Sequence, residues 1–101
     1  MKIVYIAGRY RAETINEMHD NIEAARKVAV KWWQNGFACI TPHMNSAFMD
    51  GATDDSVFLE GGLKILSRCD IIVMMKGWEG SEGARNEYER AKELGLKVIF
   101  E

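Results

Sequence analysis

A single acidic side chain, Glu87, lies where an acid is least expected. At 3.6 residues per turn, the apolar side chains of residues 82–94 fall on one helical stripe, and Glu87 falls inside it. Because burying a lone carboxylate is costly, such a group must be paired, hydrogen-bonded or protonated. Carboxyl groups perturbed in this way occur in functional sites and in structural networks. Glu87 is therefore a candidate site residue, and the alternative is that it bends to the helix edge and stays solvated.

The residues before this helix could hold an anion. Ser81 occupies an N-cap position, and helix N-termini with free backbone amides bind phosphate. A glycine-rich turn at residues 76–80 brings Trp78 to the same edge. Arg9 and Arg11 follow the first apolar run, where they either contact an anion or remain solvated. Small phosphorylated ligands are thus compatible with the sequence.

Residues 42–55 form a long polar loop with little periodicity, whose polar groups are His43, Asn45 and Asp50. Loops of this length in a small domain are usually functional or mobile. A lone loop histidine is more often a surface residue than a catalyst, so both interpretations of His43 remain open.

Strands and helices alternate along the chain. Short β-branched runs predict strands, and Thr14 with Glu17 forms a capping box ahead of a helical stripe that stops at Gly36. Gly61 and Gly62 interrupt another helical segment, which indicates either a break or a close approach to its backbone. The predicted strands are residues 2–7, 37–41, 71–75 and 97–100, and the predicted helices are 14–36, 57–68 and 82–94.

The order β-α-β-α-β-α-β predicts an α/β fold: a single-domain three-layer sandwich over residues 1–101, with a flavodoxin- or Rossmann-like four-stranded parallel sheet of order 2-1-3-4. Ligands bind such sheets at the carboxyl ends of the strands, whereas Asp70 precedes the third strand and is expected to be a cap or turn residue. Exposed edge strands and the pair Trp32 and Trp33 predict self-association into a homo-oligomer.

Composition narrows the function classes. The 101 residues carry a net charge of −2 with a pI near 5.7, which disfavours a nucleic-acid polymer as partner. The longest apolar run, residues 71–75, is far shorter than the roughly 20 residues that cross a bilayer, and the start lacks signal-peptide features. Cys39 and Cys69 fit free thiols in a reducing cytoplasm. We expect no metal site, because two Cys and two His have no metal-binding spacing.

These residues resemble those of the nucleoside 2-deoxyribosyltransferase-like superfamily, which includes the 2'-deoxynucleoside 5'-phosphate N-hydrolases, and look closest to a bacterial and phage branch of it. The similarity covers nearly the whole chain, and its most specific motif places a Glu six residues after a Ser. The motifs are Tyr5-Ile6-Ala7-Gly8 with Tyr10-Arg11, Pro42-His43 with Asn45, Asp50-Gly51, Leu59-Glu60-Gly61, Cys69-Asp70, Gly77-Trp78-Glu79 and Ser81-x-Gly83-Ala84-x-x-Glu87.

The resemblance implies retaining glycosyl chemistry on a nucleotide or nucleoside, without metal or cofactor. Glu87 would attack the anomeric carbon, with Tyr5 beside it and the deoxyribose, and Ser81 would bind the 5'-phosphate. The implied substrate-binding residues are Gly8, Arg9, Arg11, His43, Asn45, Trp78, Ser81 and Gly83.

The chain departs from the hydrolases at Gly62, where they carry an Asp that assists the leaving base. Proton delivery is typically worth about 10²- to 10⁴-fold in rate. Glu60 lies two residues away, and on a helix this spacing turns it to another face. A second departure is Arg9, where the branch tends to carry Pro. Three hypotheses follow: an N-glycosidase or deoxyribosyltransferase, a nucleotide-sequestering protein on the same fold, or an oligomer interface built from Glu87 and the arginines.

Overall fold

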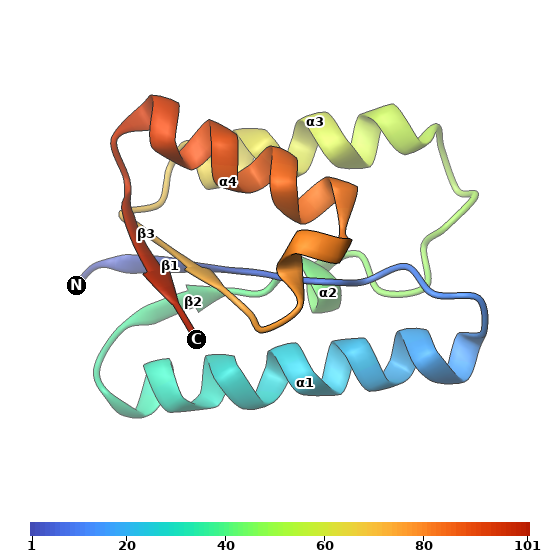
Figure 1. The fold of residues 1–101 in the computed structure, drawn as a ribbon, viewed down its shortest axis with the longest axis horizontal. Helices are drawn as coiled ribbons and strands as arrows, with labels where there is room; N and C mark the ends of the chain where they lie inside the picture. Colours follow the sequence, from blue (N-terminus) through green and yellow to red (C-terminus); the bar gives the residue numbers. More distant parts are fainter.

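The computed structural model describes all residues, 1–101, as an α/β sandwich (Figure 1). Its elements alternate between strands and helices along the chain, as the sequence predicts. They are β1 (Ile3–Ala7), α1 (Ile15–Gln34), β2 (Ala38–Ile40), α2 (Pro42–Asn45), α3 (Asp55–Leu66), β3 (Ile71–Met74), a 3₁₀ turn (Trp78–Gly80), α4 (Glu82–Leu94) and β4 (Lys97–Phe100).

All four strands are parallel, in the order β2-β1-β3-β4, which confirms the predicted order. Helix α1 covers one face of the sheet and helices α3 and α4 cover the other, so the molecule has three layers (Figure 1). Tyr5 of the central strand β1 pairs with Ile40 of β2 and Ile72 of β3.

The alternation of side chains along β1 creates two cores. Val4 and Ile6 pack with the apolar stripe of α1, whereas Tyr5 and Ala7 point to the layer of α3 and α4. Because both faces of β1 are covered, its sequence is continuously apolar rather than alternating. Tyr5 is fully buried and reaches the side of the sheet on which Glu87 lies.

Side-chain caps fix the starts of the two longest helices, at the predicted residues Thr14 and Ser81, although the return bond of the predicted capping box, from the Thr14 N–H to the Glu17 side chain, is absent. Thr14 Oγ1 accepts a hydrogen bond from the backbone N–H of Glu17 at 3.1 Å, and Ser81 Oγ accepts one from Ala84 at 3.2 Å. These bonds satisfy amides that the first helical turn leaves unpaired.

The segment 42–55 is more ordered than a plain loop. Pro42 occupies the first turn of the short helix α2, where its missing N–H is not needed. Helix α3 then begins at Asp55, two residues before the predicted start, and runs unbroken through its two glycines. A Cβ atom at Gly62 would lie 3.4 Å from Tyr5 Oη, which is ordinary contact, and one at Gly61 would meet no atom. The helix is therefore not broken at these glycines, and Tyr5 lies against it at Gly62.

Two further features concern the edges of the sheet. Asp70 accepts a hydrogen bond from the backbone N–H of Ile3 at 2.8 Å, at the amino end of the strands, which confirms its structural role. Trp33 and Phe100 are more than half exposed, whereas Trp32 packs against Phe37 in the core. Self-association stays a prediction.

No helix combines the length and the apolar character needed to cross a membrane.

Candidate active site

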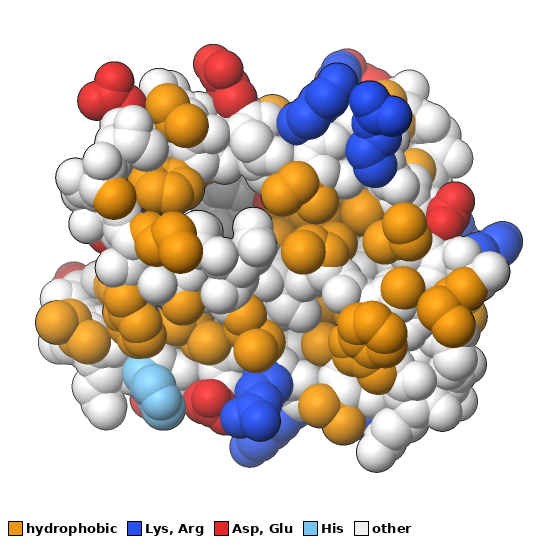
Figure 2. Space-filling model, turned by 180° about the vertical axis from the view of Figure 1, so that it is seen from behind, with side chains coloured by type: hydrophobic (Ala, Val, Ile, Leu, Met, Phe, Trp, Pro, Cys, Tyr) orange, Lys and Arg blue, Asp and Glu red, His pale blue; other side chains and the backbone are white.

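A cavity of about 570 Å³ opens at the carboxyl end of β1, between the loop that follows it, the segment 42–50, and helices α3 and α4. Seen from the side of α3 and β2, the surface is hollowed, and hydrophobic side chains gather around the hollow (Figure 2). The volume is within the range of small-molecule sites, roughly 300–1,000 Å³. Eight of the ten site residues predicted from the sequence line this cavity: Tyr5, Gly8, Arg9, Arg11, His43, Ser81, Gly83 and Glu87.

The other two predicted residues lie off the cavity. Trp78 packs its ring against Tyr88, with centroids 4.8 Å apart, and against Phe100, so it belongs to the core beside α4. Asn45 is an exposed residue at the end of α2. Neither is placed to touch a molecule held in the cavity.

In the lining of the cavity, the hydroxyl of Tyr5 donates a hydrogen bond to Oε2 of Glu87. Glu87 is half-buried on the second turn of α4, and Tyr5 is fully buried in β1. Burial raises the pKa of Glu87 to about 7, and the hydrogen bond from Tyr5 opposes this shift. Burial and the nearby carboxylate also raise the pKa of Tyr5. Glu87 is therefore a pocket carboxyl group that titrates near neutral pH.

After Asp55 at its first turn, the wall contributed by α3 is apolar. Phe58, Leu59 and Leu63 line it together with Gly62, the residue whose backbone approaches Tyr5. Glu60 is exposed and does not line the cavity, as its helical spacing predicts.

The start of α4 forms a corner rich in hydrogen-bond donors. The backbone amides of Glu82 and Gly83 donate no hydrogen bond within the chain, because the cap of Ser81 reaches only Ala84 and the backbone carbonyl of Ser81 takes the next amide. Arg9 crosses this corner: its Nε donates to the carbonyl of Gly77 at 3.0 Å.

Gly80 makes this course of Arg9 possible. A Cβ atom on Gly80 would lie 2.0 Å from Arg9 Nη2, so the guanidinium occupies space that a larger residue would fill. The corner therefore combines two free amides, one hydroxyl and one guanidinium, a donor set suited to an anion.

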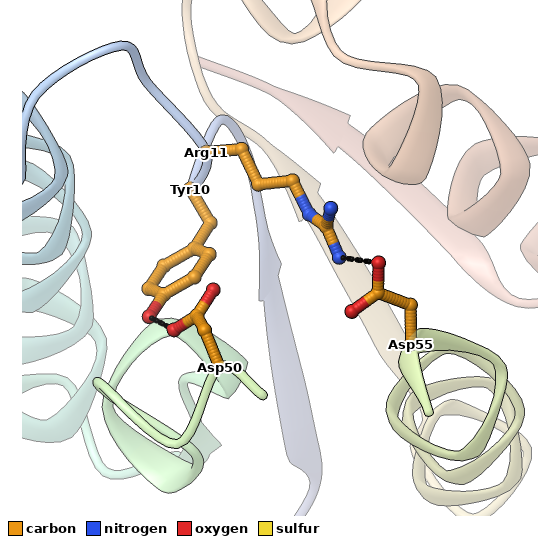
Figure 3. A network of polar contacts seen from close by, with 4 residues as sticks. All are labelled: Tyr10, Arg11, Asp50 and Asp55. Atoms are coloured by element: carbon orange, nitrogen blue, oxygen red, sulfur yellow. Dashed lines mark hydrogen bonds and ion pairs between the residues drawn. The ribbon is translucent and has the colours of Figure 1, made fainter. Parts of the chain in front are cut away.

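Two polar contacts connect the β1–α1 loop to the opposite rim (Figure 3). Tyr10 donates to Asp50 at 2.7 Å and accepts from the backbone N–H of Phe48 at 3.0 Å. Arg11 pairs with Asp55 at 3.0 Å on the exposed first turn of α3. Sequence reasoning missed the role of Asp55 and these pairings, because the partners are about 40 residues apart and no local pattern relates them.

His43 is 4% exposed, so it is not the surface residue that its loop position favoured. Its Nε2 lies 2.8 Å from the carbonyl oxygen of Arg9, and since a carbonyl only accepts, Nε2 carries the proton. Burial lowers the pKa of His43, although the carbonyls of Arg9 and Gly8 oppose this. The ring is thus neutral, with Nδ1 buried and without a partner.

Gly8 is required by packing. A Cβ atom there would lie 2.7 Å from Sδ and 3.0 Å from Cβ of Met75, so the loop after β1 can lie against the end of β3 only with glycine.

No group of three or more His, Cys, Asp or Glu side chains is arranged to hold a metal ion.

Comparison of the sequence with protein families gives one match, over residues 2–100, to the family described as "Domain of unknown function (DUF4406)". The chain belongs to the DUF4406 family. A search of curated protein sequences finds no relative of this DUF4406 chain.

Solved structures place the DUF4406 chain in a known fold. It matches a 2-deoxyribosyltransferase from Leishmania mexicana with a TM-score of 0.70 and 18% identity, over 99% of this chain and 63% of that one. It matches a 2-deoxyribosyltransferase from Bacillus psychrosaccharolyticus with a TM-score of 0.70 and 17% identity, over 97% and 70%. The predicted resemblance to the nucleoside 2-deoxyribosyltransferase-like superfamily is therefore confirmed in fold, while this chain spans less than two thirds of the Leishmania protein.

Proposed function

We propose that this protein cleaves or transfers the N-glycosidic bond of a (deoxy)nucleoside 5'-monophosphate through a covalent intermediate on Glu87. The observation that carries the proposal is the half-buried Glu87 carboxyl group, which lies in a ligand-sized cavity and accepts a hydrogen bond from the buried Tyr5. A carboxylate held in one orientation at the carboxyl edge of a parallel sheet is suited to attack a sugar carbon.

The chemistry would proceed in two displacements. An oxygen of Glu87 attacks the anomeric carbon as the base leaves, and water or a second base then attacks the same carbon and releases the carboxylate. Because each displacement inverts the anomeric carbon, the two together retain its configuration. Tyr5 would hold one carboxylate oxygen, leaving the other free to attack.

The donor corner at the start of α4 supports a 5'-phosphate on the substrate. The free amides of Glu82 and Gly83, the hydroxyl of Ser81 and the guanidinium of Arg9 would contact its oxygens. Arg11 would add a contact only by leaving Asp55, with which it is now paired.

The comparisons support nucleosides as the substrate class. Both solved structures are described as 2-deoxyribosyltransferases, and the one from Bacillus psychrosaccharolyticus as a biocatalyst for the synthesis of nucleosides. Addition of a second free base separates the two reactions, because a transferase forms a new nucleoside or nucleotide with it whereas a hydrolase releases the free sugar.

The test combines product release with trapping of the intermediate. Protein is incubated with deoxynucleoside 5'-monophosphates and with the matching nucleosides, and the free base is followed by chromatography. Intact mass is measured after incubation with 2'-fluoroarabino analogues, whose fluorine slows the second displacement. We expect a glycosyl adduct on Glu87 and higher kcat/KM for the monophosphates.

Glu87→Gln should abolish both the adduct and base release. Glu89→Gln is the matched control, because Glu89 lies on the same helix in an exposed ion pair with Lys92 and does not line the cavity. Base release that survives Glu87→Gln would refute the assignment of the nucleophile.

The apolar wall of α3 favours one other candidate, a protein that binds nucleotides without turnover. It would show ligand-dependent thermal stabilisation with no base release and no adduct. If no nucleotide alters stability, both candidates fail, and an interface role for Glu87 and the arginines becomes the better explanation.

A further inference from the structure

Each acidic or imidazole side chain that lines the cavity either makes a hydrogen bond or ion pair already or lies beside the proposed phosphate position. His43 holds its only proton against the carbonyl of Arg9. Asp50 accepts a hydrogen bond from Tyr10, and Asp55 is paired with Arg11, so both carboxyl groups already serve as acceptors. Glu82 lies at the exposed start of α4, beside the proposed phosphate position.

Tyr5 is no substitute for an acid. Its hydroxyl proton points to Glu87, and giving it up would leave a tyrosinate in a fully buried position. Burial raises the pKa of Tyr5, which makes that loss more costly still.

Beyond Asp55, which is paired with Arg11, the α3 wall offers only apolar groups and the backbone of Gly62. Ser46 and Asn86 also line the cavity, but a hydroxyl and an amide donate hydrogen bonds and are too weakly acidic to give up a proton. A leaving base therefore meets no free acid of this chain.

We infer that the preferred substrates are nucleotides whose base bears a formal positive charge, as in pyridinium or N7-alkylpurinium nucleotides, because such a base departs neutral without a proton. The inference rests on the proposed function and names its substrate class. It uses the observation that no acid is free in the cavity, which is independent of the position of the nucleophile.

The step balances without an added acid. One Glu87 oxygen bonds to the anomeric carbon while the carbon–nitrogen bond breaks. The electron pair of the broken bond stays on the nitrogen and neutralises the charged ring. Water then attacks that carbon, the ester bond breaks, and the electron pair returns to the Glu87 carboxylate. The surplus proton of water passes to solvent. With an ordinary base, the first step would expel an anion instead.

The charge of the cavity is compatible with a cationic base. Four acidic side chains line it, namely Asp50, Asp55, Glu82 and Glu87, against two arginines, Arg9 and Arg11. Arg9 lies in the donor corner proposed for the phosphate, and Arg11 forms an ion pair with Asp55. The cavity therefore has no free cation to repel a charged ring.

The experiment compares 7-methylguanosine 5'-monophosphate with guanosine 5'-monophosphate, in ribose and 2'-deoxyribose forms. Each pair differs by one methyl group and one charge. Base release is followed by chromatography, with enzyme-free rates subtracted. We expect kcat/KM to be at least about 100-fold higher for the methylated nucleotide, since proton delivery is typically worth 10² to 10⁴. An enzyme with its own acid gains little from the methyl charge.

Substitution of Gly62 tests the effect of an acid on the apolar wall formed by α3. The Cβ of Gly62→Asp would lie 3.4 Å from Tyr5 Oη, at the edge of ordinary contact, and Gly62→Asn has nearly the same size without an acidic proton. Gly62→Asp should accelerate the unmethylated substrate relative to Gly62→Asn and so reduce the methyl preference.

The outcomes separate the two proposals. Equal cleavage of both nucleotides by the parent protein overturns the inference and leaves the proposed function standing. No cleavage of either, with no adduct on Glu87, overturns both. If Gly62→Asp fails to fold, the comparison on the parent protein still decides.

Discussion

The protonation of Glu87 controls whether it can attack a sugar, because only the carboxylate is nucleophilic. Its pKa of about 7 arises from burial, moderated by the hydroxyl of Tyr5. Activity should therefore rise as pH increases through about 7. In Tyr5→Phe the moderating hydrogen bond is lost, the pKa rises further, and the rising limb of kcat/KM moves to higher pH.

Tyr10→Phe is the matched control for this pH profile, since it removes a cavity hydroxyl that contacts Asp50 rather than Glu87. In Tyr10→Phe the rising limb of kcat/KM should lie at the same pH as in the parent protein. A Tyr5→Phe profile that overlays the parent profile would contradict the role given to this hydrogen bond.

The same burial makes Glu87 a source of instability at high pH. A carboxyl group whose pKa rises from 4.5 to about 7 on folding is protonated in both states below pH 4.5 and ionised in both above pH 7. Between these values the folded state holds the extra proton, so stability falls as pH increases, by up to about 3 kcal/mol. Glu87→Gln should escape this loss.

Urea unfolding at pH 5 and pH 8 would measure the effect. The gain of Glu87→Gln over the parent protein should be larger at pH 8, whereas the exposed control Glu89→Gln should change little at either pH. A gain that is the same at both pH values would show that ionisation of Glu87 is not responsible.

At the scale of elements, the sequence predicts most of what is local. Helix α4 has the predicted bounds, because a cap at Ser81, an apolar stripe and Gly95 all act within a few residues. The burial of Glu87 also follows from that stripe. The burial of His43 and the pairings of Tyr10 and Arg11 do not, since they depend on segments brought together by the sheet.

The N-cap of α4 has two roles that substitution can separate. Ser81→Ala removes the cap and should cost about 1 kcal/mol of unfolding free energy. Ser81→Asp keeps an acceptor for the amide of Ala84, so stability should be retained, but its negative charge should repel a phosphate. We therefore expect Ser81→Asp to raise KM for a monophosphate far more than for the nucleoside.

Thr14→Ala is the control for the structural part, because Thr14 caps α1 and does not line the cavity. It should lower stability by a similar amount without altering the ratio of KM values. Equal effects of Ser81→Asp on nucleotide and nucleoside would argue against a phosphate at this helix start.

For the whole molecule, the cavity walls belong to four separate segments: β1 with its loop, residues 42–50, α3 and α4. A ligand that contacts them all binds only the folded chain and stabilises it by mass action. At 100 times Kd this amounts to roughly 2.7 kcal/mol, and since 1 kcal/mol raises the Tm of a domain of this size by about 4–8 °C, Tm should rise by about 10 °C or more. Calorimetry with an accepted monophosphate would measure the shift. Arg9→Gln should reduce it at the same ligand concentration, because Arg9 supplies the guanidinium of the donor corner that we propose for the phosphate, where the Gly77 carbonyl holds it. A shift that survives this substitution, but disappears when the phosphate is removed from the ligand, would place the anion elsewhere in the cavity.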